Sequence, residues 1–275
     1  MTRKTEVSYQ HLFTYIDCNI FSLDGGSFIS DYERAMRNAL RNLHPNTNYY
    51  ACWFHFCQAC KKNARRFPGF EVAIKNNKSA YILFLKFLHL PLLPANLILN
   101  AFNVLKVETI AVSKTLFDPF VTYFEHQWLK SEGTERISVF KRNTRTTSSI
   151  EAYNLNLGKK IHAKGHTFKF VKCLIDAEYE KSREFALLFQ NGGLGNAAPK
   201  RHLRDRAEKI MDEMNLLDRQ EIDVTGFLAR TVGLCDNFHK KDIFDSIDEE
   251  MTPNLPNLAS LDISISSSSL NEVLN

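Results

Sequence analysis

Residues 27–35 read SFISDYERA, and this short segment sets the fold class. Residues 27–30 are typical of a β-strand, while residues 32–43 place apolar side chains on one helical face until Pro45. Asp31 therefore lies at the C-terminal end of a strand, where α/β sheets place their ligands. Read alone, an Asp in this position is more often a helix N-cap that accepts backbone N–H groups.

The flanking segments continue the alternation of strand and helix. Residues 5–20 carry apolar side chains at helical spacing, residues 47–53 are rich in aromatic and β-prone types, and residues 54–66 return to a helical pattern. Two strands that alternate with two helices predict a βαβα unit and an α/β sheet. We place this unit at residues 1–70.

The rest of the chain is predicted to be helical, which makes the protein mostly helical overall. Residues 71–147 show helical segments, no clear strand, and interruptions at Asn76-Asn77, Pro91, Pro94 and Pro119, which together indicate an all-helical insertion. Residues 148–240 are expected to form further C-terminal helices. Residues 241–275 combine prolines, a serine run and acidic residues, which is typical of an acidic disordered tail.

Composition is that of a globular protein with a sizeable core. The 275 residues are 44% hydrophobic and 24% charged, and the 21 phenylalanines lie mainly in helical stretches, which favours core packing. The net charge is +4, but residues 241–275 carry −6, which leaves +10 on residues 1–240. A basic body of this kind suits either a polyanionic partner or an ordinary solvated surface.

Several classes of protein are disfavoured by the sequence. No apolar segment of a secretory signal follows Met1, so we expect a nuclear or cytoplasmic location, not secretion. The six cysteines are then expected to be reduced thiols. The apolar run at residues 81–93 is interrupted by Lys86, His89 and Pro91, which argues against a membrane partner.

Residues 52–60 read CWFHFCQAC and contain both Cys-x2-His and Cys-x2-Cys spacings. A structural zinc site normally requires four ligands in two separated pairs, whereas these candidates crowd into nine residues. The alternative is that Cys52 is a buried strand residue while Cys57 and Cys60 pack on one helix face. The spacing favours packing over zinc.

Residues 145–154 read RTTSSIEAYN and predict the start of a helix. The Ser/Thr run offers an N-cap, and Glu151 would fall in the first turn, where the helix dipole favours a carboxylate. Asn154 follows three residues later, on the side of the helix that carries Glu151. Read alone, this segment is also explained by capping.

The three segments, in this order, resemble the Mutator-like (MULE) transposase domain family, insect type. The resemblance covers about residues 1–235 and includes GHTFKF at 165–170, GGLG at 192–195 and VTGFL at 224–228. It implies an RNase H-like fold, of which this chain would hold a partial core, and three carboxylates that hold two divalent metals. Such a metal pair activates the attacking oxygen and stabilises the leaving oxygen of a DNA phosphodiester.

The resemblance implies roles for particular residues. Asp31 matches the second Asp of the triad and Glu151 matches its Glu, so both are the expected catalytic and metal-binding residues. Cys52 and His55 match a motif that helps to order the active site, and Asn154 is expected to support it. The ancestral enzyme would use Mg²⁺ or Mn²⁺, which prefer carboxylate oxygens; whether this chain binds either metal stays open.

The first Asp of the triad has no counterpart in the sequence. The family places it on a strand well upstream of the second, whereas Asp17 and Asp24 lie in no convincing strand. We therefore expect an N-terminally truncated core that is catalytically incomplete on its own. The alternative is a non-enzymatic DNA-binding or protein-interaction module built on the same scaffold.

Basic residues supply the expected DNA contacts. The candidates for contact with the DNA backbone are Lys61, Lys62, Arg65, Arg66, Arg142 and Arg145. Solvated helix faces would explain the same charges. Self-association is a further expectation, either through an exposed sheet edge or through residues 81–93.

Overall fold

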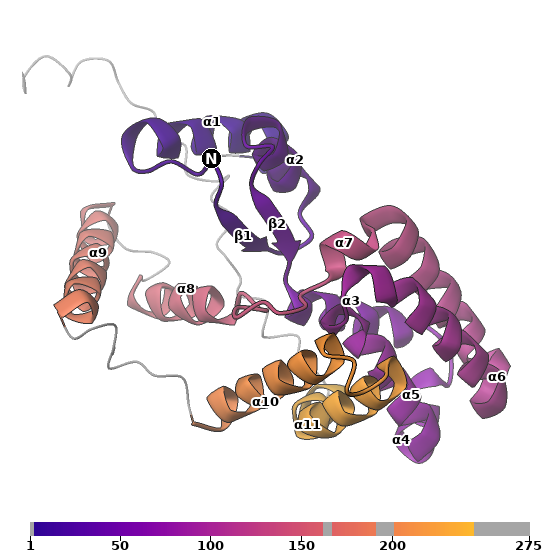
Figure 1. The fold of residues 1–275 in the computed structure, drawn as a ribbon. Helices are drawn as coiled ribbons and strands as arrows, with labels where there is room; N and C mark the ends of the chain where they lie inside the picture. The colour runs from indigo at the N-terminus through magenta and orange to yellow at the C-terminus, as the bar shows by residue number, and fades with distance from the viewer. Residues whose placement is uncertain (1–2, 162–166, 191–200, 245–275) are drawn as a thin grey trace, which may run out of the picture.

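The computed structural model describes residues 3–161, 167–190 and 201–244 (Figure 1). The chain is mostly helical, as predicted, with 76% helix and one two-stranded parallel sheet. The elements, in chain order, are α1 (Glu6–Asn19), β1 (Ser27–Ser30), α2 (Arg34–Leu43), β2 (Asn48–Ala51), α3 (Trp53–Ala64), α4 (Phe70–Asn76), α5 (Lys78–His89), η1 (Leu90–Leu92), α6 (Ala95–Phe124), η2 (Glu125–Glu132), α7 (Thr134–Ile137), α8 (Ser148–Lys160), α9 (Thr167–Gln190), α10 (Arg201–Asp218) and α11 (Val224–Phe244).

The two strands form the predicted β-α-β unit. They pair in parallel from Ser27 opposite Asn48 to Ser30 opposite Ala51. Parallel strands cannot be joined by a tight turn, and here α2 makes the crossover. Helices α1 and α2 pack beside the sheet over a small apolar cluster, formed by Tyr9, Phe13, Leu23, Ala39 and Leu40 (Figure 1). The strand predicted at residues 27–30 is confirmed.

The main hydrophobic core lies in the helical part of the chain. Its largest fully buried side chains are mostly phenylalanines, namely Phe56, Phe70, Phe84, Phe87, Phe102, Phe117, Phe120, Phe124 and Phe227, together with Trp128. They come from α3, α4, α5, α6, η2 and α11, so all three regions predicted before residue 240 contribute. The predicted role of phenylalanine in core packing is confirmed.

The interruption that was predicted at Pro119 lies elsewhere. Helix α6 runs through Pro119, and the non-helical residue is Ser113, with φ −175° and ψ 100°. Phe117 and Phe120, which flank the proline, are fully buried. Tertiary packing therefore holds the helix at a position where proline alone would break it.

Residues 81–93 belong to the core, and their predicted role in self-association is wrong. Most of their side chains in α5 and η1 are buried, including Leu85, Phe87 and Leu90 at 0% exposure. A second chain could reach them only if the core opened. The sheet edge, the other route considered for self-association, stays a prediction.

One helical stretch is long and apolar enough to cross a membrane by length and composition. It runs from Ala95 to Glu132, with a mean hydropathy of 1.3 over its most apolar window, of which 28% is buried. Core helices of soluble proteins pass the same test, and Phe102, Phe117 and Phe124 of this stretch pack inside the main core. The stretch therefore does not indicate a membrane.

The C-terminal helices agree with the expectation for residues 148–240, and α11 extends the helical region to Phe244. The tail expected from residue 241 is wrong for residues 241–244, because they continue α11. Residues 245–275 and the motifs at 165–166 and 192–195 lie outside the described residues. Helices α8 and α9 lie to one side of the helical body (Figure 1) and are joined by a Lys160–Glu180 ion pair of 2.7 Å.

Buried His89 predicts how stability depends on pH. Burial, assisted by Lys61, lowers the pKa of its imidazole to about 3, against about 6.5 in an unfolded chain. Between these values the unfolded state binds the extra proton, so stability is present above pH 6.5 and is lost as the pH falls.

We expect His89 alone to lower the free energy of unfolding by about 2 kcal/mol between pH 7 and pH 5. Urea denaturation at the two pH values measures the change, and His89→Gln should remove that part of it. Exposed His11 supplies the control for the substitution itself, because His11→Gln keeps the buried imidazole of His89. An unchanged pH dependence in His89→Gln would contradict the prediction.

Candidate carboxylate site at the ends of the strands

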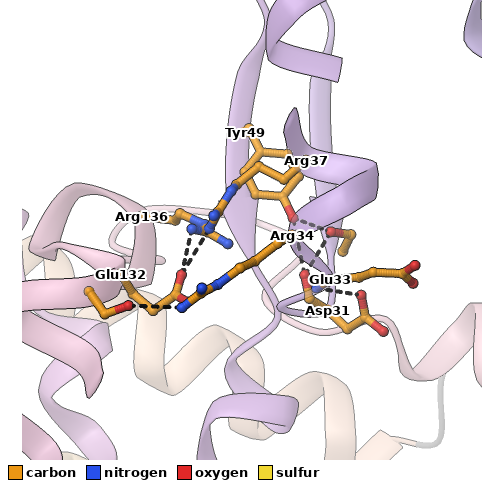
Figure 2. Close-up of polar contacts among 9 residues, drawn as sticks. Asp31, Glu33, Arg34, Arg37, Tyr49, Glu132 and Arg136 are labelled. Carbon is orange, nitrogen blue, oxygen red and sulfur yellow. Dashed lines mark hydrogen bonds and ion pairs between the residues drawn. The ribbon is translucent and has the colours of Figure 1, made fainter. Parts of the chain in front are cut away.

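Asp31 directly follows β1 and accepts hydrogen bonds from Glu33 and Tyr49. Its Oδ1 accepts the backbone N–H of Glu33 at 3.2 Å, and its carbonyl oxygen accepts the Tyr49 hydroxyl at 3.0 Å (Figure 2). The N-cap position of α2 is Glu33, not Asp31. The half-buried Asp31 carboxylate thus satisfies one N–H group near the helix start while keeping oxygens for another partner.

Cys52 joins the end of β2 to the segment that precedes α8. Its backbone N–H bonds the carbonyl of Ser30 at 2.8 Å, which extends the strand pairing by one residue. Its Sγ accepts the backbone N–H of Thr147 at 3.3 Å. One residue further, the N–H of Trp53 bonds the carbonyl of Arg145 at 2.9 Å. The Cys52–Thr147 bond connects positions 95 residues apart, and the predicted burial of Cys52 is confirmed at 0% exposure.

Glu151 reaches the same place from the first turn of α8, as predicted. Its Oε1 accepts the Thr147 hydroxyl at 2.8 Å and lies 3.5 Å from Nε2 of His55. Thr147 occupies the N-cap position, but its side chain makes no capping bond to the helix backbone. The threonine hydroxyl serves the Glu151 carboxylate instead, and this is a role that the sequence did not predict.

The pKa values of Cys52 and His55 move towards each other. Burial acts to raise the pKa of the Cys52 thiol, but hydrogen bonds with His55 and Thr147 outweigh it and lower the pKa. The hydrogen bond with Cys52 raises the pKa of His55 against the effect of burial, and the charges of Glu151 and Asp31 raise it further. The charges of both carboxylates therefore favour the protonated form of the His55 imidazole.

The donor chemistry fits a hard divalent cation only in part. Asp31 and Glu151 supply the carboxylate oxygens that Mg²⁺ or Mn²⁺ prefer. Within residues 3–161, 167–190 and 201–244, however, no three His, Cys, Asp or Glu side chains are grouped so as to hold a metal ion. Two carboxylates from this part of the chain would need a further ligand to complete such a centre.

The remaining cysteines and Asn154 lie away from these contacts. Cys57 and Cys60 are buried on α3, as the packing interpretation predicted, and the Cys57 thiol contacts the Leu88 carbonyl at 3.7 Å. Every cysteine in the described residues is free of disulfide bonds. Asn154 is exposed on α8 and takes part in none of the contacts described above, so its support of the site stays a prediction.

The predicted DNA-contacting residues divide by exposure. Lys62, Arg66 and Arg142 are exposed and Arg65 is half-buried, which keeps them available to a phosphate backbone. Lys61 and Arg145 are buried at 5% and 8% exposure, and for these two the prediction is wrong. The Arg145 guanidinium donates to the carbonyls of Arg142 and Ala207, so it fixes the loop before α8 to α10.

Comparison with known proteins adds no assignment to this geometry. The chain matches no protein-family model, no curated protein and no solved structure. A functional proposal therefore rests on the residues themselves and on how the fold brings them together.

Proposed function

We propose that this chain is a Mutator-like transposase domain whose partial RNase H-like core is the unit around β1 and β2. DNA is the proposed partner, and Mg²⁺ or Mn²⁺ is the proposed cofactor of the ancestral enzyme. Asp31 and Glu151 are the proposed metal-binding carboxylates, with Cys52 and His55 ordering the site. A bound metal pair would supply Lewis-acid activation for phosphodiester cleavage and strand transfer.

One observation carries the proposal, namely that Glu151 contacts His55 close to the end of β2, while the charge of Asp31 also acts on His55. Glu151 Oε1 is 3.5 Å from His55 Nε2, and the charges of both Glu151 and Asp31 raise the pKa of His55. Capping alone would give Glu151 no reason to contact a residue that follows β2. A carboxylate placed near the C-terminal ends of parallel strands suits a ligand site.

The chain's own residues would prepare the site in two ways. Thr147 holds the Glu151 carboxylate by its hydroxyl and the Cys52 thiol by its backbone N–H, which fixes the start of α8 against the end of β2. The neighbours of His55 raise the pKa of its imidazole, and a protonated imidazole would offset negative charge beside Glu151. A third carboxylate is not part of this assignment, so we propose that the chain by itself is catalytically incomplete.

Purified protein tests the proposal with a labelled DNA duplex and either Mg²⁺ or Mn²⁺. We expect DNA binding that weakens steeply between roughly 50 and 200 mM salt and shows no sequence preference, because phosphate contacts dominate. We expect no nicking or strand transfer. Arg66→Ala should weaken binding, whereas Arg219→Ala, which removes an equal charge elsewhere, should not.

Two outcomes would change the assignment. Nicking that Asp31→Ala abolishes would show a complete active site and overturn the proposed incompleteness. Absence of DNA binding even at low salt would remove DNA as the partner. Binding without cleavage is the result expected both for the incomplete transposase domain and for the alternative function, a non-enzymatic DNA-binding module, which the exposed Lys62, Arg66 and Arg142 support. Either function fits the proposed nuclear or cytoplasmic location.

A further inference from the structure

Two arginines converge on one buried carboxylate near Asp31, and a third arginine lies beside them (Figure 2). Arg37 and Arg136 both donate from Nη1 to the same oxygen of Glu132, Oε2, at 3.0 and 2.5 Å. Arg34 extends towards the same segment and bonds the Ser131 hydroxyl at 3.1 Å (Figure 2). The group draws on α2, η2 and α7, and we call it the arginine cluster.

The arginine cluster has more donors than acceptors. The Glu132 side chain is 2% exposed and the Arg136 side chain 5%, so neither relies on bulk water. Among the described residues, no acceptor meets Nε and Nη2 of Arg136 or Nε of Arg37, although all three atoms are buried. Unpaired buried donors are costly, which makes this arrangement unfavourable unless something else accepts from them.

Contacts with aromatic rings do not replace the hydrogen bonds that Arg136 lacks. The Arg136 guanidinium carbon lies 5.9 Å from the ring centroid of Tyr32 and 5.5 Å from that of Tyr49. A ring face is a weaker acceptor than a carboxylate or phosphate oxygen. The rings therefore position Arg136 without supplying a full hydrogen-bond acceptor for its Nε and Nη2 atoms.

The arginine cluster contains three guanidinium groups and one carboxylate, that of Glu132. The first turn of α2 begins with Arg34 and contains no acidic residue, although Glu33 occupies the N-cap position. The N-terminal end of a helix carries a partial positive charge, so a cation there is unfavourable and an anion is favourable. Arg34 and Ser131 are exposed, which leaves the cluster open on their side.

We propose that the arginine cluster is a binding site for a phosphate group, held by Arg34, Arg37 and Arg136 at the start of α2. Guanidinium groups match the oxygens of phosphate in geometry and in charge, and a phosphate can accept several N–H groups at once. The group is either a phosphodiester of a nucleic acid backbone or a free phosphate. The site requires neither Asp31 nor Glu151 and therefore goes beyond the proposed function.

Thermal unfolding in EDTA tests the site without any contribution from a divalent metal. Inorganic phosphate is added to one set of samples, a short DNA duplex to a second, and sodium chloride at equal ionic strength to a third. We expect phosphate, DNA or both to raise the Tm relative to chloride. Arg34→Ala should weaken the apparent affinity roughly tenfold to a hundredfold, because it removes a charge-assisted contact.

Controls separate this site from general charge effects. Arg34 is exposed, so circular dichroism should show Arg34→Ala to be folded. Arg219→Ala removes an equal charge from an exposed position that pairs only weakly with Glu221, at 3.8 Å, and should leave the affinity unchanged. A DNA effect that depends on Arg34, without a phosphate effect, would identify the nucleic acid backbone as the source.

The proposal is overturned if neither phosphate nor DNA raises the Tm, or if Arg34→Ala and Arg219→Ala respond as the wild type does. Failure of the proposed function gives a different pattern. An Asp31→Asn variant that no longer responds to Mg²⁺ or Mn²⁺ but keeps the Arg34-dependent rise in Tm would leave the phosphate site intact.

Discussion

Replacing Phe124 with alanine is expected to lower the free energy of unfolding by about 3–5 kcal/mol. Phe124 is fully buried, and its ring lies 5.4–6.0 Å from the ring centroids of Phe56, Phe87, Phe102 and Phe120. Removal of the ring loses its transfer free energy and leaves a cavity that these rigid neighbours cannot fill.

Exposed Phe168 provides the matched control for this substitution. Its side chain is 89% exposed on α9, so Phe168→Ala should change the free energy of unfolding by less than about 0.5 kcal/mol. Urea denaturation followed by circular dichroism measures both variants. If the two substitutions had equal effects, the buried aromatic cluster would not be the main source of stability.

Replacing Glu132 with glutamine is expected to cost about 3–5 kcal/mol of stability, although the two side chains have nearly the same shape. The carboxylate is the one negative charge that the described contacts give to Arg37 and Arg136. Without it, two guanidinium groups would remain close together and largely buried. The cost of an uncompensated buried charge exceeds the value of the ion pair itself.

Glu125→Gln is the control for loss of a paired carboxylate at the surface. Glu125 lies 3.0 Å from Lys130 and 3.3 Å from Lys106, and all three side chains are substantially exposed. Water screens such pairs, so we expect a change below about 1 kcal/mol. A loss at Glu132 no larger than that at Glu125 would show that solvent reaches the arginine cluster more freely than its burial indicates.

Local patterns predicted most of the secondary structure. The β-prone run at residues 27–30 ends at a polar residue, and this sufficed to place β1. Helices α1, α2 and α3 follow from apolar periodicity, with ends shifted by a few residues at most. The break predicted at Pro119 does not occur there, because buried Phe117 and Phe120 keep that part of α6 helical.

Side-chain environment was less predictable. Lys61 and Arg145 look like any other basic residue in the sequence, yet the fold buries them. The segment at 81–93 is apolar enough for either a core or an interface, and only the packing of α4, α6 and α11 around α5 decides for the core. No local pattern indicated the roles of Thr147 or Glu132, each of which joins a partner four residues away to a partner about 95 residues away.

The sequence by itself determined the order of helices and strands and the position of Asp31 after β1, because these follow from periodicity and chain stiffness over a few residues. The tertiary structure alone decided that Glu151 meets His55 and that Arg37 and Arg136 share Glu132. Such contacts join residues up to about a hundred positions apart. Charge and burial depend on those distant neighbours, and no local segment of the chain specifies them.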